Sequence, residues 1–156
     1  LREFETLASL QPGAIGPPTI VGMLHYAAGR TAEARKQYEA VLQLDRSAVV
    51  AANNLAWMTM EEGGNLDVAL QLARTASQRA PNSAEVADTL GRIYYRKELY
   101  SSAIAAFEQS VTSDPQNADY HLQLALALAK YGDMSRARTA LAAALKLNPQ
   151  VAGAAE

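Results

Sequence analysis

A proline recurs at a fixed interval in the second half of the chain: Pro81, Pro115 and Pro149 lie 34 residues apart. Alanine keeps this interval at Ala69, Ala103 and Ala137. The register slips by one residue across the turn at 61–65, and an insertion confined to a loop is what a structural repeat tolerates. A period of this length is typical of solenoids, whose units bury their apolar faces by stacking on neighbours. The interval therefore predicts a stack of similar units.

Composition and small residues predict that each unit is a pair of packed helices. Hydrophobic residues make up 49% of the 156 residues and aromatic residues 6%, with few β-branched runs, which argues against a sheet. Small residues recur midway along each first helix (Gly22, Ala56, Gly91, Ala125) and early in each second helix (Ala34, Ala69, Ala103, Ala137). They allow two antiparallel helices to approach to ~8–10 Å. Larger side chains at Tyr38, Phe107 and Leu141 are expected to fill the space beside that contact.

Turn and cap signals separate the expected helices. Gly29 and Gly132 suit the left-handed position that ends a helix, and Glu98 stands where glycine would be expected, so we expect that turn to be strained or differently closed. The capping residues that we expect at the start of the following helices are Thr31, Asn82–Ser83, Asn117 and Asp133. Each recurrent proline follows a second helix and prevents its continuation.

The stretch Leu90-Gly91-x2-Tyr94, Ala103-x3-Phe107 and Pro115 resembles the tetratricopeptide repeat pattern in full. Partial copies occur at Val21-Gly22-x2-His25 with Ala34-x3-Tyr38, at Leu55-Ala56-x2-Thr59 with Ala69-x3-Ala73 and Pro81, and at Leu124-Ala125-x2-Leu128 with Ala137-x3-Leu141 and Pro149. The resemblance implies an all-α, right-handed superhelical solenoid of antiparallel helix pairs. Residues 53–57 and 88–95 also resemble bacterial members of the family, which leaves bacterial cytoplasm and periplasm both open.

We expect a single domain over 1–156 with four repeats at 15–48, 49–83, 84–117 and 118–151. Residues 1–12 resemble the second helix of a preceding, incomplete repeat, and 152–156 form a tail. Both ends therefore look cut, as in a fragment of a longer protein. On the last helix, Leu141, Leu145 and Leu147 are expected to leave apolar surface exposed or to cover it in a dimer.

In the family that the chain resembles, first helices line a concave groove that binds peptides. The resemblance and the i, i+4, i+7 spacing on one helix face predict a groove lined by Met23, Tyr26, Asn53, Asn54, Trp57, Met60, Asp88, Arg92, Tyr95, Arg96 and Leu126. Aromatic residues, Met and Arg dominate binding hot spots. The alternatives are that Trp57 belongs to the core, that Asp88 and Arg92 form a solvated pair within one helix, and that Arg92 and Arg96 only promote solubility.

A subgroup of this family grips C-terminal carboxylates with a clamp of Lys, Asn and Arg residues. Only Asn54 matches that clamp. Thr19 and Met23, and Glu85 and Thr89, stand where its other residues would be, and Glu85 has the wrong charge for a carboxylate ligand. We therefore do not expect a carboxylate clamp.

Several function classes are disfavoured by what the sequence lacks. The net charge of −2 and the pI of about 5.7 argue against nucleic-acid binding. No apolar stretch approaches the ~20 residues of a membrane span, and the absence of cysteine excludes thiolate metal sites. His25 and His121 fall in different repeats at packing positions and are expected to be buried or half-buried. No phosphate loop or nucleophile motif occurs. We expect no enzyme activity, no cofactor and no metal.

The sequence thus predicts a protein–protein interaction scaffold that binds a protein or peptide in its groove. Two alternatives stay open: a rigid spacer or self-assembly segment that forms homo-oligomers through exposed repeat ends, and an accessory domain of an enzyme that lies outside this segment.

Overall fold

The computed structural model describes residues 2–11 and 13–151, and in this part of the chain it has nine helices and no strand. Contacts divide the chain into two compact units, Leu1–Arg79 and Ala80–Glu156. The first unit contains α1 (Arg2–Leu10), α2 (Gly16–Ala27), α3 (Thr31–Leu44), α4 (Val49–Glu61) and α5 (Leu66–Arg79). The second contains α6 (Ala84–Arg96), α7 (Tyr100–Ser113), α8 (Ala118–Tyr131) and α9 (Met134–Leu147). The prediction of an all-α fold is confirmed.

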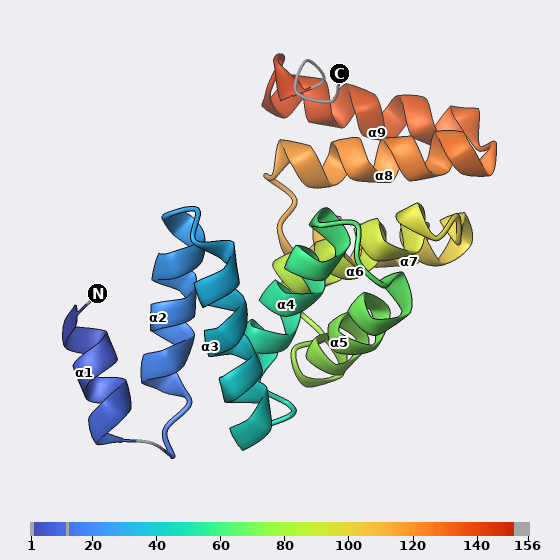
Figure 1. Ribbon diagram of the computed structural model, residues 1–156. Coiled ribbons are helices and arrows are strands. Elements are labelled where there is room, and N and C mark those ends of the chain that lie inside the picture. The colour runs from blue at the N-terminus through green and yellow to red at the C-terminus, as the bar shows by residue number, and fades with distance from the viewer. Residues whose placement is uncertain (1, 12, 152–156) are drawn as a thin grey trace. The chain divides into compact units, whose positions relative to one another are not determined.

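Within each unit, consecutive helices pack side by side as hairpins (Figure 1). In the first unit α2 packs on α1 and α3, and α4 packs on α3 and α5. In the second unit α7 lies between α6 and α8, and α9 packs on α8. The boundaries of the four repeats stay a prediction. The expected tail at 152–156, together with residues 1 and 12 of the partial repeat, lies outside the described residues.

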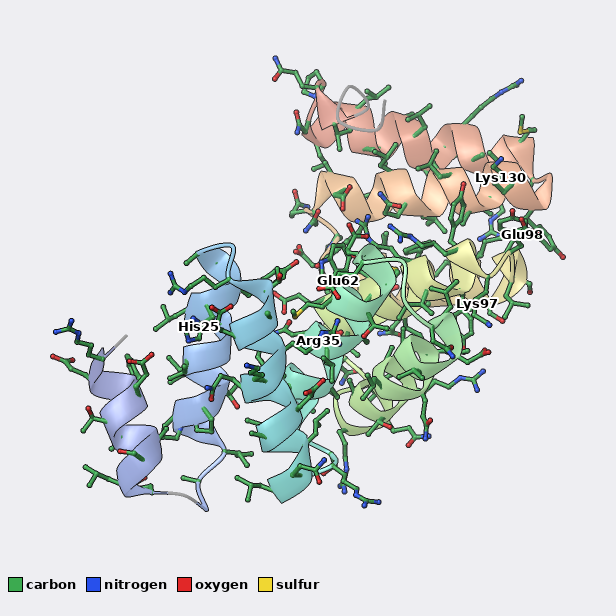
Figure 2. The ribbon with its side chains drawn as sticks, viewed as in Figure 1. His25, Arg35, Glu62, Lys97, Glu98 and Lys130 are labelled. Carbon is green, nitrogen blue, oxygen red and sulfur yellow. The ribbon has the colours of Figure 1, made fainter. Side chains whose placement is uncertain are left out.

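The turns within the hairpins confirm the glycine positions. Gly29 has φ of 72° and Gly132 has φ of 98°, both in the left-handed region that glycine adopts without steric cost. Glu98 occupies the corresponding turn between α6 and α7 with φ of 59° (Figure 2), and among the described residues it is the only non-glycine with positive φ. The expected strain at Glu98 is therefore confirmed.

Three of the expected helix caps are confirmed and one is wrong. Ser83 accepts a hydrogen bond from the backbone N–H of Val86, Asn117 from that of Asp119, and Asp133 from that of Arg136. Thr31 does not cap α3, because the helix already begins at this residue and Arg30 occupies the capping position without a side-chain hydrogen bond.

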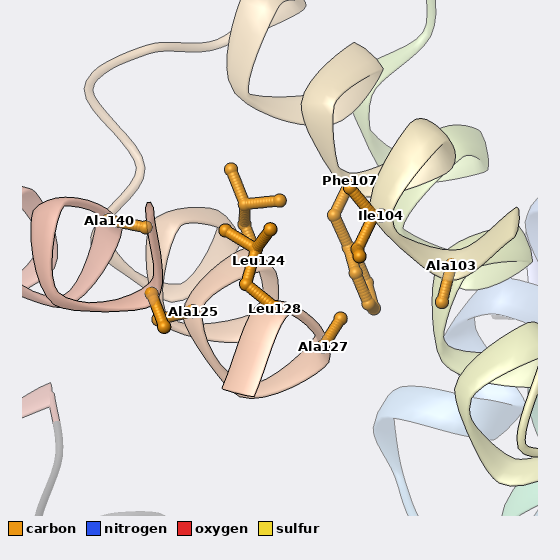
Figure 3. Packing of buried hydrophobic residues seen from close by; sticks show 9 residues of the cluster. Ala103, Ile104, Phe107, Leu124, Ala125, Ala127, Leu128 and Ala140 are labelled. Carbon is orange, nitrogen blue, oxygen red and sulfur yellow. The ribbon is translucent and has the colours of Figure 1, made fainter. Parts of the chain in front are cut away.

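Each unit has a core where one second helix meets the next first helix. In the first unit, Ala34, Tyr38 and Val41 of α3 pack with Leu55 and Met58 of α4. Arg35 of α3 also pairs with Glu62 after α4, at 2.7 Å between Nη2 and Oε2 (Figure 2). In the second unit, α7 and α8 meet through Ala103, Ile104, Phe107, Leu124, Ala127 and Leu128 (Figure 3). The same kind of joint therefore occurs in both units.

The two histidines are packing residues, as predicted. His25 is buried between α1 and the turn after α2: Arg30 Nε donates to its Nδ1 at 2.8 Å, and its Nε2 lies 3.8 Å from Glu5. His121 is half-buried, with Nε2 3.0 Å from the carbonyl oxygen of Pro115.

Candidate protein-binding surface

Three predicted groove residues come together in the first unit. Trp57 Nε1 of α4 donates a hydrogen bond to Tyr26 Oη of α2 at 3.1 Å. Tyr26 and Met23 are 39% and 49% exposed, and Trp57 is half-buried. Helix α3 packs against both α2 and α4, which holds these two first helices close enough for this bond. Met23, Tyr26 and Trp57, which we name the aromatic patch, thus present amphipathic surface on a rigid support.

The neighbouring predicted residues in this unit have structural roles. Asn54 Nδ2 donates to Tyr38 Oη at 3.0 Å, so its amide satisfies the hydroxyl of a fully buried tyrosine. Met60 is 1% exposed, so it offers no surface to a partner. Asn53 is half-buried, and its buried Oδ1 accepts no hydrogen bond from any described residue. We leave Asn54 and Met60 out of the candidate surface.

In the second unit, the predicted residues Asp88 and Arg92 belong to a polar network between α6 and α8. Arg92 Nε donates to Asp88 Oδ2 at 2.7 Å, and its Nη2 donates to Asp119 of α8. Gln123 Nε2 in turn donates to Asp119 Oδ1 at 3.3 Å. The pair Asp88–Arg92 is therefore more than a solvated pair within one helix, because the guanidinium also links two neighbouring first helices.

The remaining predicted residues lie apart from this network. Tyr95 is half-buried and packs edge-on against Tyr100, with ring centroids 5.5 Å apart. Arg96 is exposed, and Leu126 of α8 is 37% exposed. The sequence did not predict Asp119 and Gln123 as members of this network. They lie in the first two turns of α8, which is the first helix of the repeat after that of Arg92, and this place is the signal that could have indicated them.

Burial raises the pKa of Asp88, and the nearby Asp119 carboxylate raises it further, although the Arg92 guanidinium lowers it. Asp88 is 7% exposed, and its Oδ1 has no hydrogen-bond partner in the described part of the chain. When folding raises the pKa of a carboxyl group, protonation of that group contributes to the free energy of unfolding, and this contribution is complete below the pKa that the group has in the unfolded chain. That contribution is lost as the pH rises through the folded pKa.

We predict that Asp88→Asn removes this pH dependence. The free energy of unfolding of the unmodified chain, minus that of the variant, should fall as the pH rises from about 3 to 7, by about 1.4 kcal/mol for each unit by which the pKa is raised. Urea unfolding followed by circular dichroism at several pH values measures this difference.

Asp45→Asn is the control with the opposite sign. The N–H and hydroxyl of Ser47 donate to Asp45 Oδ1 at 2.8 and 2.7 Å and lower the pKa of Asp45. The corresponding difference should therefore rise with pH in the acidic range. A difference for Asp88→Asn that also rose with pH would contradict the assignment of Asp88 as a carboxyl with a raised pKa.

Residues 2–11 and 13–151 offer neither a metal site nor a membrane span. No group of three or more His, Asp or Glu side chains there is placed to hold a metal ion. None of the described helices has the length and apolar character needed to cross a bilayer.

Paired helices stacked through a recurrent small-residue joint define a helical-repeat protein of the solenoid class. Residues 22–84 and 89–152 match the tetratricopeptide repeat, and the chain belongs to this family. Members of the family are typically non-catalytic scaffolds. In a comparison with curated protein sequences, the chain has no match.

Solved structures of the same fold include a crystal structure of MamA, with a TM-score of 0.80, 18% identity, and coverage of 97% of this chain and 88% of that chain. MamA 41-end from Desulfovibrio magneticus RS-1 has a TM-score of 0.80, 20% identity, and coverage of 96% and 84%. The APC/C hetero-tetramer Cut9-Hcn1 has a TM-score of 0.83 and 22% identity, and covers 94% of this chain but 29% of the other. At these identities the likeness shows the fold alone, and it confirms the predicted solenoid class.

Proposed function

We propose that this protein is a scaffold that docks a partner protein or peptide on its first-helix surface, with the aromatic patch as the main anchor. The observation that supports this most directly is the hydrogen bond between Trp57 Nε1 and Tyr26 Oη beside the exposed Met23. Tyrosine and tryptophan supply large contact area with few rotatable bonds, and they dominate binding hot spots. The bond fixes both rings before binding, so less conformational entropy is lost when a partner docks.

The polar network of the second unit, taken by itself, would select between ligands rather than anchor one. Asp88 and Asp119 place two carboxylates around the single guanidinium of Arg92. Because the arginine already contacts both acids, the local formal charge of this trio is −1. A carboxylate of a partner is therefore disfavoured here, which agrees with the absence of the carboxylate-clamp residues.

Trp57 is the only tryptophan in the chain, so its fluorescence reports on the aromatic patch. Partners are captured from a lysate of the source organism, identified, purified and titrated against the chain. We predict that a genuine ligand shifts the Trp57 emission and that Trp57→Ala weakens binding about tenfold or more, as expected for a hot-spot aromatic. Isothermal titration calorimetry measures the affinity of the variant, which has no tryptophan signal.

Val68→Ala is a matched control, because Val68 is 49% exposed on α5, a second helix of the same unit. This variant should bind with unchanged affinity. If Trp57→Ala and Met23→Ala left the affinity for the identified partner unchanged while their helix content was intact, the first-helix surface would not be the docking site. The spacer, self-assembly and accessory-domain alternatives stay predictions.

A further inference from the structure

A shallow apolar trough of about 200 Å³ lies along the last helix pair, between α8 and α9. Its lining includes Leu122, Leu126, Met134, Ala137, Arg138 and Leu141. Met134 is 57% exposed, and Leu126 and Leu141 are 37% and 36% exposed. The sequence-based expectation that the last helix exposes apolar surface is confirmed for Leu141, and also for Leu145 and Leu147, each 37% exposed.

The preceding repeat shows what covers this face. Subtracting the repeat length of 34 residues places Ala137, Arg138 and Leu141 on Ala103, Ile104 and Phe107 of α7. Those three residues are at most 7% exposed, because the following first helix, α8, packs on them through Leu124, Ala127 and Leu128 (Figure 3). We name Leu124, Ala127 and Leu128 of α8 the α8 seam. The trough is therefore the surface that corresponds, one repeat earlier, to the surface of α7 that α8 covers.

The first unit repeats this arrangement. Helix α4 covers Ala34 and Tyr38 of α3 with Leu55 and Met58, which are spaced i, i+3 like Leu124 and Ala127 of the α8 seam. Two independent joints of the chain thus use the same kind of occupant, an amphipathic helix with apolar residues at i and i+3. This spacing places both side chains on one helix face.

Charge distinguishes the trough from the internal joints. Arg138 stands where Ile104 is buried in the preceding repeat, and it is exposed and makes no ion pair with other described residues. The charged residues of α9 are Arg136, Arg138 and Lys146, and Arg136 already pairs with Glu108 of α7 and with Asp133. Arg138 is therefore the cation of α9 that lines the trough. Lys130 lies one turn beyond Leu126, near the end of α8 (Figure 2). A helix that covers the trough is therefore favoured when an acidic side chain flanks its apolar seam.

We propose that the α8–α9 trough docks an amphipathic helix of a partner protein, with an apolar i, i+3, i+4 seam flanked by an acidic residue. This site is separate from the aromatic patch and does not depend on it. A first helix of a second copy fits less well, because Val21 of α2, Leu55 of α4, Ile93 of α6 and Leu124 of α8 are all buried. Helix α1 of a second copy, which has no buried residue and exposes Leu7 and Leu10, is the competing occupant that light scattering tests.

The test uses a labelled, end-capped peptide of residues 118–131, which carries the α8 seam, in two forms. His121 lies one turn before Leu124 on the same helix face and is replaced by Glu in one peptide and by Lys in the other. Fluorescence anisotropy measures their binding to the 156-residue chain. The Glu peptide should bind saturably and about tenfold more tightly than the Lys peptide, and Arg138→Glu in the chain should reverse this preference.

Two substitutions block the trough itself. Leu141→Glu and Met134→Glu should each weaken binding of the Glu peptide about tenfold or more, because they place a carboxylate in the apolar trough. Met134 begins α9, where an acidic residue is compatible with the helix dipole, so this variant keeps its fold. Val50→Glu, at a residue 44% exposed on α4, is the control and should leave peptide binding unchanged.

Three results would overturn the proposal. They are no saturable binding of the Glu peptide, binding that Leu141→Glu and Met134→Glu leave intact, and equal affinity for both peptides. Light scattering gives a fourth: if the chain self-associates and Leu141→Glu makes it monomeric, a second copy occupies the trough and a partner helix does not.

Discussion

Replacing Phe107 by alanine should lower the free energy of unfolding of the second unit by about 3–5 kcal/mol, the cost of deleting a buried aromatic ring. Phe107 is fully buried in the joint between α7 and α8, in contact with the α8 seam (Figure 3). Its removal leaves a cavity between two helices that are held mainly by apolar contact. Because each repeat is stabilised by its neighbours, the loss should spread to α8 and α9.

Leu141→Ala is the matched control for this prediction. Leu141 occupies the Phe107 position one repeat later but is 36% exposed, so its truncation removes less buried surface and should cost about 1 kcal/mol. Urea unfolding followed by circular dichroism gives both values. Equal losses for the two variants would show that Phe107 contributes no more to stability in the joint between α7 and α8 than Leu141 does on α9.

The fold could be predicted because its determinants are local and recur. Side-chain size at Gly91, Ala103 and Phe107, together with the caps at Ser83 and Asp133, can be recognised in each repeat without knowledge of distant contacts. The failure at Thr31 has a physical reason. A threonine can cap a helix or occupy its first position, and Arg30, which donates to His25, already takes the capping place.

The candidate surface was harder to predict, because exposure depends on neighbouring repeats. Helical spacing places Met60 near Trp57 on one helix face, yet Met60 is buried and Trp57 is half-buried. Asn54 likewise reaches Tyr38 on the adjacent second helix, a contact that helical spacing within α4 does not reveal. The bridge from Arg92 to Asp119 joins residues 27 positions apart and requires the three-dimensional register of two repeats.

Placing a side chain at Gly91 should destabilise the second unit, because Gly91 lies directly against the ring of Phe107. A Cβ atom at this position would lie 2.6 Å from Phe107 Cδ1 and Cε1, closer than carbon atoms can approach. Gly22 faces Tyr38 in the same way, at 2.7 Å from Cε1. The chain thus has glycine where the facing residue of the second helix is aromatic. In the other two repeats this facing position is held by Ala73 and Leu141, and the residue on the first helix is alanine, Ala56 and Ala125.

We therefore predict that Gly91→Val lowers the free energy of unfolding by about 3 kcal/mol, at the upper end of the cost of overpacking a core. Ala125→Val at the matched position should cost about 1 kcal/mol, because the partly exposed Leu141 can move aside. The milder Gly91→Ala should lose less, since alanine favours the helix by up to about 1 kcal/mol. Urea unfolding at a fixed pH compares the three variants.

A double substitution tests the cause. Gly91→Ala combined with Phe107→Leu recreates the pair Ala125 and Leu141 of the following repeat, which the chain already accommodates. If the clash with the ring is what destabilises Gly91→Ala, the alanine should cost about 1 kcal/mol less, or even stabilise, once Phe107 is leucine. Strictly additive effects of the two substitutions would instead show that the effect of Gly91→Ala arises within the backbone of α6. The close approach of α6 to α7 would then not depend on glycine at this position.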